Sequence, residues 1–579
     1  MTRDPRNASP PSGDLTDLAL VGLGCLVAIA GVLWAGAAFT AGLTGSRLPP
    51  SGIAGTLGLL RHPGDPSAAW GVPMARPFLY WTVTGCLVAV VTTLTVLVVR
   101  WSRREGHARR TDPRTLPGTA TKLEVLQAAG PRTVTRRARH ARPSLTHPHP
   151  REVGYLLGRA RGAEAWASVE DSILVVGPPR SGKGLHLVIP MILDAPGAVV
   201  TTSTRPDNIT VTHAARRSLG RPVAVFDPQG LAAGVPDGLR WSPVRGCDSP
   251  QTAMIRARGL SAGTGMSRTV DGGDFWQAQT ETVLRALLHA AALDGRPPRD
   301  LYRWSLDPAA VTEAVTILGR PTAAPGWDNA LEQAAHSDPR TRDSIWLGVR
   351  QALSALADPR VLDAVTPRDG EAFDPAAFLR ERGTLYVLGT ASGAGAAAPL
   401  VSALVEDMVE TARRLAAASL GARLDPPLLL ALDEIGNLAP LPSLPALMSE
   451  GGGSGVTTLA VLQSLSQARD KWGEQQAGTL WDAAIVKIIL GGGSNARDLT
   501  DLAALIGDRD EETTSVSRDH KGGRSTSSGV RRVAVMDTSR LRTLPFGTGV
   551  LLLRTAPPVV LDLAPWPKRD GAVQAVDFG

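Results

Sequence analysis

Cysteine is scarce in this sequence of 579 residues, and its scarcity excludes two classes of protein. The three cysteines, Cys25, Cys86 and Cys247, form no C-x-x-C pair, which excludes a disulfide scaffold and a zinc ribbon. The 61 glycines and 45 prolines follow no period, which excludes a collagen or coiled-coil architecture. Hydrophobic residues make up 43% and charged residues 20%, so global disorder is excluded as well. The length predicts several domains.

Positive charge is concentrated in one short stretch. The formal net charge of the chain is +7, yet residues 100–151 alone contain thirteen Arg or Lys residues against three acids. The stretch 105–150 is rich in Arg, Pro, Thr and His and has no sustained periodicity. We therefore expect a basic linker there that contacts either anionic membrane lipids or nucleic-acid phosphates.

Two long uncharged runs near the N-terminus predict transmembrane helices. Residues 18–46 contain no charged side chain, and residues 77–99 form a second such run. About 20 apolar residues cross the hydrocarbon core of a bilayer, so we expect spans over about 18–43 and 78–99. A cleaved signal peptide is the alternative for the first run, but the run is too long for one and a second span follows.

Arginines predict the orientation of these spans. Arg100, Arg103, Arg104, Arg109 and Arg110 directly follow the second run, which favours a cytoplasmic location for its C-terminal end. Two spans then return the N-terminus to the cytoplasm, and residues 1–104 form a multi-pass membrane anchor. Most of the chain is therefore expected to be cytoplasmic.

A phosphate-binding loop is the first strong functional motif. The apolar residues 172–176 predict a buried strand, and a helix-like run begins at residue 185. The loop between them reads G-x-x-x-x-G-K-G and comprises Gly177, Pro178, Pro179, Arg180, Ser181, Gly182, Lys183 and Gly184. Its backbone N–H groups and the helix N-terminus are expected to bind the phosphates of ATP, with Lys183 on the β- and γ-phosphates. Gly184 stands where Ser or Thr usually supplies a Mg²⁺ ligand.

Two further strand ends carry residues suited to ATP hydrolysis. Residues 428–432 are all apolar and lead into Asp433 and Glu434, which is the pattern of a Walker B strand. Asp433 is expected to hold Mg²⁺ through water, and Glu434 to polarise the attacking water. Residues 456–462 form a similar strand followed by Gln463, which is expected to sense the γ-phosphate or to place the water.

The order of the predicted elements indicates an interrupted α/β domain. Short strands over 198–202, 222–226, 384–388 and 485–490 fit one twisted parallel sheet. Residues 248–375 have few strand signals and several helical runs, which predicts an all-α insertion. The nucleotide-binding domain is therefore expected in two parts, 151–247 and 376–579.

Taken together, these features resemble the coupling proteins of type IV secretion and conjugation, the VirD4/TraG/TraD group. The resemblance rests on two N-terminal spans, the GPxxSGKG loop, TSTRPD within 200–207, VFDP at 225–228, LDEIGNL at 432–438 and LQSLSQ at 462–467. In addition, the polar segment 513–532 is similar to the hairpin that these proteins place before a terminal strand pair, here GVLLLR and VVLDL.

This resemblance implies a RecA/FtsK-like P-loop NTPase that assembles as a hexamer at the bacterial inner membrane. It implies a motor that recruits the relaxase–DNA complex or protein substrates and passes them to the secretion channel with ATP and Mg²⁺. Residue by residue, it implies phosphate binding by Lys183, Mg²⁺ binding by Asp433, activation of water by Glu434 and coupling to the γ-phosphate by Gln463. A loop that ends in glycine, as at Gly184, matches this family.

Two other functions fit parts of the sequence. A double-stranded DNA translocase of the FtsK or TraB kind also combines membrane spans with this motor. However, the helical insertion and the lack of a recognisable winged-helix reader after residue 510 favour a coupling protein. The third interpretation is a nucleotide-binding membrane scaffold with little turnover. Residues 449–455, which lack the basic residue that family members often have there, argue for it, and the complete set of Lys183, Asp433 and Glu434 argues against it. Arg469 and Arg497 are the candidates for a trans arginine finger.

Overall fold

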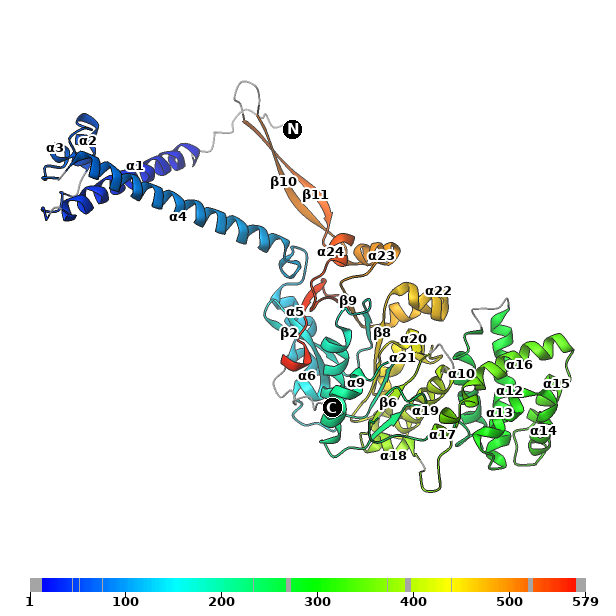
Figure 1. Cartoon of the computed structure of the whole chain (residues 1–579). Helices are drawn as coiled ribbons and strands as arrows, with labels where there is room; N and C mark the ends of the chain where they lie inside the picture. Colours follow the sequence, from blue (N-terminus) through cyan, green and yellow to red (C-terminus); the bar gives the residue numbers. More distant parts are fainter. Residues whose placement is uncertain are drawn as a thin grey trace. The chain divides into compact units, whose positions relative to one another are not determined.

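The computed structural model describes two compact units, Met1–Asp112 and Pro113–Gly579, and each is treated by itself (Figure 1). The described residues are 13–43, 45–50, 53–74, 76–232, 234–266, 272–371, 373–390, 397–438, 440–518 and 524–568.

The N-terminal unit is helical. It contains α1 (Gly13–Leu43), α2 (Ile53–Arg61), α3 (Pro66–Trp70) and α4 (Pro77–Thr111). A small apolar cluster of Ala37, Leu59, Trp70 and Tyr80 is buried between these helices. The hydroxyl of Tyr80 donates a hydrogen bond of 3.2 Å to the carbonyl oxygen of Leu33. A hydrogen bond therefore joins α4 to α1 in addition to the apolar contacts.

One stretch of this unit has the length and composition of a membrane span. Pro77–Leu97 in α4 has 21 residues and a mean hydropathy of 1.7, and it is the only such stretch among the residues searched, which are the described ones. The corresponding part of α1, Val27–Leu43, is apolar but shorter than a span. The structure therefore supports the second predicted span, and the first remains a prediction.

Residues 113–150 differ from the linker that we predicted. They contain a short 3₁₀ turn (Pro113–Thr115), α5 (Lys122–Ala129), α6 (Pro131–Ala141) and the start of α7 (Pro150–Val153). Thr121 and Glu124 form a capping box at the start of α5, and Pro131 occupies the first turn of α6. The helices bury Val125, Ala129, Val134, Ala138 and Ala141. Their apolar faces consist of alanines and two valines among arginines, so the helical period is weak in the sequence.

A large mixed sheet organises the second unit. In the described residues it has eleven strands in the order β2-β1-β13-β12-β9-β3-β8-β7-β4-β6-β5. Their bounds are β1 (Gly154–Ala160), β2 (Ala163–Ser168), β3 (Ile173–Val176), β4 (Val199–Ser203), β5 (Val223–Phe226), β6 (Thr384–Leu388), β7 (Leu428–Leu432), β8 (Val456–Leu462), β9 (Val486–Leu490), β12 (Thr548–Leu553) and β13 (Val559–Asp562).

The prediction of a wholly parallel sheet is wrong at one side. The run from β9 to β5 is parallel, whereas β12, β13, β1 and β2 pair in antiparallel fashion. For the pairs β1–β2 and β12–β13, the physical reason is the length of the connections. Only two residues separate β1 from β2, and a parallel neighbour requires a crossover of a dozen residues or more.

Both faces of the parallel part are covered. Along β3, Ile173 and Val175 lie in one buried apolar cluster, and Leu174 and Val176 lie in the other. Helix α8 (Ile189–Asp194) belongs to the first face, and α19 (Ala398–Ala417) to the second. This two-sided burial is why the central strands read as continuous apolar runs.

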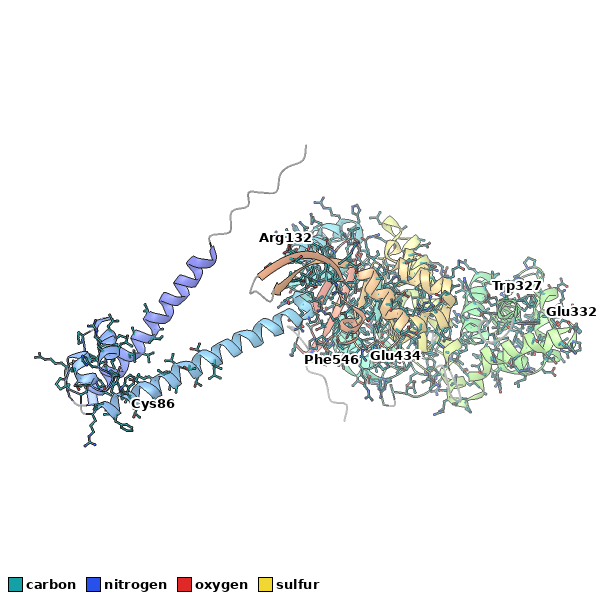
Figure 2. The ribbon with its side chains drawn as sticks, turned by 90° about the horizontal axis from the view of Figure 1, so that it is seen from above. Cys86, Arg132, Trp327, Glu332, Glu434 and Phe546 are labelled. Carbon is teal, nitrogen blue, oxygen red and sulfur yellow. The ribbon has the colours of Figure 1, made fainter. Side chains whose placement is uncertain are left out.

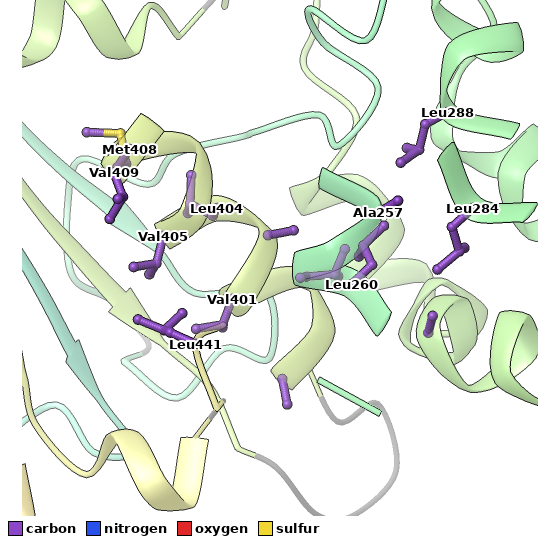
Figure 3. Packing of buried hydrophobic residues seen from close by; sticks show 14 of the residues in the cluster. Ala257, Leu260, Leu284, Leu288, Val401, Leu404, Val405, Met408, Val409 and Leu441 are labelled. Atoms are coloured by element: carbon purple, nitrogen blue, oxygen red, sulfur yellow. The ribbon is translucent and has the colours of Figure 1, made fainter. Parts of the chain in front are cut away.

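Helices fill the chain between β5 and β6. They are α10 (Pro250–Ala262), α12 (Gly273–Leu293), α13 (Pro298–Leu306), α14 (Thr312–Leu318), α15 (Trp327–Ala335), α16 (Pro339–Leu353), α17 (Pro359–Ala364) and α18 (Pro375–Arg380). The described part of this segment contains no named strand. Helix α10 packs on α19 of the sheet domain (Figure 3).

The contact of α10 with α19 combines close backbone approach with a buried ion pair. A Cβ atom on Gly259 would lie 2.9 Å from the Cα of Ala403, so only glycine permits this approach. Arg256 pairs with Asp407 at 2.9 Å and lies 4.5 Å from the ring centre of Trp241. The insertion is therefore joined rigidly to the sheet domain.

The remaining elements follow the Walker B strand. They are α20 (Ile435–Leu438), α21 (Leu444–Glu450), α22 (Leu465–Ala483), α23 (Ala496–Ile506) and α24 (Thr538–Arg542). Helix α9 (Asp207–Arg217) lies earlier in the chain and follows β4. Strands β10 (Asp508–Arg518) and β11 (Arg524–Ala534) form a separate two-stranded ribbon that projects away from the main sheet (Figure 1). The described residues of the polar segment, 513–518 and 524–532, lie in these two strands.

We expect residues 113–150 to stabilise the nucleotide-binding domain. A fragment of residues 151–579 would expose the apolar surface under α5 and α6 and would lose the 2.6 Å ion pair between Arg142 and Asp425. Relative to residues 113–579, its free energy of unfolding should fall by at least about 3 kcal/mol, the value of two buried valines. Urea denaturation of both fragments measures this difference. Equal midpoints and slopes would show that α5 and α6 contribute nothing to stability.

Candidate functional site

The loop after β3 is strained in the way that phosphate-binding loops require. Arg180 and Gly182 have φ angles of +63° and +87°. A Cβ atom on Gly177 would lie 2.8 Å from Ser181 Oγ and 2.9 Å from Leu490 Cβ, so a side chain is excluded at this position. The amide of Gly177 donates a 3.0 Å hydrogen bond to the carbonyl of Leu462 in β8. The loop is therefore fixed to the neighbouring strand from its first residue.

The helix that follows the loop begins with a π-type turn. Residues Gly184–Val188 form this turn, and α8 continues from Ile189 with Pro190 in its first turn. Proline has no N–H to donate to the residue four positions earlier, so regular α-helical bonding is impossible there. Such π-type turns are frequent at functional sites.

Lys183 lies inside the loop. Its side chain is buried, and its ammonium group donates hydrogen bonds of 2.7 Å to the carbonyl of Gly177 and 2.8 Å to that of Pro178. Burial lowers the pKa of Lys183, while the charges of Asp433 and Glu434 raise it. The lysine is thus electrostatically coupled to both carboxylates.

Asp433 follows β7 and is held from the neighbouring strand β4. Thr202 Oγ1 donates a 3.0 Å hydrogen bond to the carbonyl of Asp433, and Asn208 Nδ2 donates one of 3.4 Å to its Oδ2. Burial is the main cause that raises the pKa of Asp433 to about 6, and the charge of Glu434 acts in the same direction. Lys183 opposes these effects. A cation at this carboxylate would favour its charged form.

Glu434 has an unusual backbone conformation. Its φ angle is +50°, and a non-glycine residue in this region costs roughly 1–3 kcal/mol. The hydroxyl of Thr204 donates a hydrogen bond to Glu434 Oε2. The carboxylate is therefore held in place by the segment after β4. Strain of this kind accumulates at functional sites.

Gln463 follows β8 beside the phosphate loop, because Leu462 pairs with Val176 of β3. The amide of Gln463 donates a 2.9 Å hydrogen bond to Gln467 Oε1, and Gln467 Nε2 donates one of 2.6 Å to Asn437 Oδ1. Because Asn437 lies in α20, directly after Glu434, Gln467 connects the end of β8 to the Walker B segment. A cavity of about 430 Å³ adjoins the loop and is lined in part by Pro178, Gln463 and Ser464.

Neither arginine-finger candidate is free in this chain. Arg469 forms an ion pair with Asp498, and Arg497 pairs with Glu474 at 2.7 Å. Either arginine would have to exchange this partner in order to act on a neighbouring subunit.

Several residues at the site were missed by the sequence analysis. Thr202, Thr204 and Asn208 lie at the end of β4 or just beyond it, and they became visible only when β4 proved to be the neighbour of β7. Phe546 was missed as well. Its side chain is 66% exposed, and its ring meets His186 edge-on at 5.1 Å beside the loop (Figure 2). The parallel order of strands was the signal that could have found the first three.

Comparison with known families supports the resemblance seen in the motifs. The family described as the TraM recognition site of TraD and TraG matches residues 427–546. This region begins just before the Walker B strand and ends at Phe546. The resemblance to the TraG and TraD coupling proteins is therefore confirmed. A comparison with curated protein sequences gave no match.

Solved structures of the conjugative coupling protein TrwB share the fold. The unbound monoclinic form of its ΔN70 fragment has a TM-score of 0.53 at 20% identity and covers 70% of this chain and 88% of that one. The trigonal form with sulphate has a TM-score of 0.54 at 19% identity, with 77% and 94% covered. The complex with ADP and Mg²⁺ has a TM-score of 0.52 at 20% identity, with 72% and 90% covered.

The raised pKa of Asp433 predicts a pH-dependent stability. Because the folded state holds this proton more tightly than the unfolded state, stability from Asp433 is present at low pH and is lost as the pH rises from about 4 to 6. Asp433→Asn removes this titration. The unfolding free energy of the variant minus that of the parent should therefore rise by about 3 kcal/mol between pH 4 and pH 7, at about 1.4 kcal/mol per unit of pKa. Urea denaturation without nucleotide measures this gain. Asp470→Asn, at a 70% exposed side chain, is the control, and the same gain there would refute the assignment.

Proposed function

We propose that this chain is a membrane-anchored ATPase of the coupling-protein family, which recruits DNA–relaxase or protein substrates and delivers them to a type IV secretion or conjugation channel. The observation that carries the proposal is the convergence of Lys183 with Asp433 and Glu434 at the carboxyl edge of a parallel sheet. The TrwB fold supports it, because TrwB structures are described with ADP and Mg²⁺ and with nonhydrolysable GTP and ATP analogues.

The residues of the site would divide the work of ATP hydrolysis. Lys183 would exchange the carbonyls of Gly177 and Pro178 for the β- and γ-phosphates. Asp433 would hold Mg²⁺, which supplies charge neutralisation at the phosphates when bound. The strained, hydrogen-bonded Glu434 would orient the attacking water, and Gln463 would couple the γ-phosphate to the neighbouring strand. The carboxylates of Asp433 and Glu434 beside the loop that carries Lys183 fit a nucleotide with its magnesium ion.

The cellular setting follows from the N-terminal unit. We infer a multi-pass anchor in the bacterial inner membrane, with α4 as one span and α1 as the other, and with the bulk of the chain in the cytoplasm. The arginines after residue 99 favour this orientation. We also propose a homo-hexamer, the assembly that the resemblance to the coupling-protein family implies.

Helix α6 offers a surface for phosphates. Arg132, Arg136 and Arg139 are exposed on the face opposite the buried valine and alanines of the helix (Figure 2 labels Arg132). Arg137 is different, because it lies 4.0 Å from Asp171. We propose that the three exposed arginines contact the DNA backbone. Contact with lipid phosphates is the alternative.

Two substitutions should separate nucleotide binding from hydrolysis. Lys183→Ala should abolish binding of a fluorescent ATP analogue to residues 113–579, because the phosphates lose their main cation. Glu434→Gln should bind the analogue with nearly parental affinity and lose at least about 100-fold in phosphate release, the lower range for a general base. Assays with and without single-stranded DNA test the motor function at the same time. Loss of binding in both variants would contradict the separate roles.

The arginine face of α6 should contribute salt-dependent DNA affinity. Replacing Arg132, Arg136 and Arg139 with Gln should reduce the slope of log affinity against log salt for single-stranded DNA by about 2, at about 0.7 for each lost contact. The matched control replaces the exposed Arg299, Arg340 and Arg350 of the helical insertion, which removes the same charge elsewhere. Equal slopes in the two triple variants would exclude DNA contact, and loss of binding to anionic vesicles alone would assign the face to lipid.

A further inference from the structure

The residue after Lys183 creates a gap in the expected magnesium site. In phosphate loops of this type the next residue usually carries a hydroxyl group that binds Mg²⁺, but this chain has Gly184. A Cβ atom built on Gly184 would have a single neighbour within 4 Å, which is Asn208 Oδ1 at 4.0 Å. Among the described residues, no group of three or more His, Cys, Asp or Glu side chains could hold a metal. Any cation here would therefore depend on few protein oxygens.

Asn208 is placed between this gap and the Walker B carboxylate. It lies in the first turn of α9, and its side chain is 2% exposed. Its Nδ2 donates to Asp433 Oδ2 at 3.4 Å, an orientation that follows from the acceptor-only character of an ionised carboxylate. The amide oxygen therefore points away from Asp433 and toward Gly184. No donor in the described part of the chain forms a hydrogen bond with this oxygen.

Amide oxygens are good ligands for hard cations. Asn carbonyl oxygens bind Ca²⁺ and Mg²⁺ beside carboxylates, and protein kinases hold their metal ions with one Asp and one Asn. An Asn oxygen is neutral, so it adds a ligand without adding charge to the pair Asp433 and Glu434. This matters because Asp433 and Glu434 already place two carboxylates side by side.

We propose that the side-chain oxygen of Asn208 supplies the Mg²⁺ ligand that the missing hydroxyl at Gly184 would provide. Gly184 and Asn208 then act together: the glycine lacks the hydroxyl, and the asparagine supplies an oxygen in its place. A side chain at residue 184 would project toward the position that this amide oxygen occupies. The backbone of Asn208 is fixed by Thr212, whose Oγ1 donates to the carbonyl of Asn208 at 2.7 Å. This inference rests on the proposed nucleotide site and adds a residue to it.

The test compares four forms of residues 113–579: the parent, Asn208→Ala, Gly184→Ser and the double variant. The probes are a fluorescent ADP, with Mg²⁺ or with EDTA, and Mn²⁺, whose binding to the ADP complex is followed by electron paramagnetic resonance. Asn208→Ala should weaken Mn²⁺ binding at least 10-fold, a typical loss at metal sites, and should leave ADP binding in EDTA unchanged. In the Asn208→Ala background, Gly184→Ser should restore most of the lost Mn²⁺ binding, because it places a hydroxyl oxygen where the amide oxygen of Asn208 was removed.

A purely structural role for Asn208 predicts other results. If Asn208 only orients Asp433 through its N–H group, Gly184→Ser cannot rescue Asn208→Ala, and failure of rescue overturns the proposal. Asn208→Asp keeps a ligand oxygen but loses the donor, so it should retain Mn²⁺ binding if Asn208 is a ligand; loss of binding equal to that of the alanine variant also overturns the proposal. Absence of ADP binding by the parent, even in EDTA, would instead overturn the proposed function itself.

Discussion

The pairing of the parallel strands is the constraint on which the site depends. Strand β3 pairs with β8 so that Val176 lies opposite Leu462, and β7 pairs with β4 so that Leu432 lies opposite Thr202. All of these strands run in one direction, so their carboxyl ends meet at one edge of the sheet. The phosphate loop, the Walker B carboxylates, Gln463 and the segment after β4 are therefore neighbours, although they are far apart in the sequence.

This arrangement brings charged side chains together in a buried site, and their burial costs free energy when no ligand is bound. Two adjacent carboxylates lie near a buried ammonium group, and burial shifts the pKa of Asp433 upward and that of Lys183 downward, in each case toward the neutral form. Glu434 has in addition a strained backbone. A nucleotide with a divalent cation would compensate these charges, so binding free energy would offset a cost that the fold already contains. Without a ligand, hydrogen bonds from Thr204 and Asn208 hold the two carboxylates, and Thr202 holds the backbone carbonyl of Asp433.

Outside the site, rigid connections join the other parts of the second unit to the sheet. The helical insertion rests on α19 through the approach of Gly259 to Ala403 and through the buried pair of Arg256 and Asp407. Helices α5 and α6 pack on β2, and α6 exposes arginines on its other side.

The sequence by itself determined the local chemistry of this protein. A glycine-rich loop between an apolar strand and a helix, and apolar strands that end in Asp433–Glu434 or Gln463, are recognisable because each signal lies within a dozen residues. The helices of the insertion between the two parts of the domain are recognisable for the same reason, because each helical run is a local pattern. Only the tertiary structure decided which strand ends are neighbours, that the sheet has an antiparallel side, and that α5 and α6 are folded. The contacts of Asn208 with Asp433 and of Phe546 with His186 join residues more than two hundred positions apart, and no local pattern encodes a contact that forms only after the strands have paired.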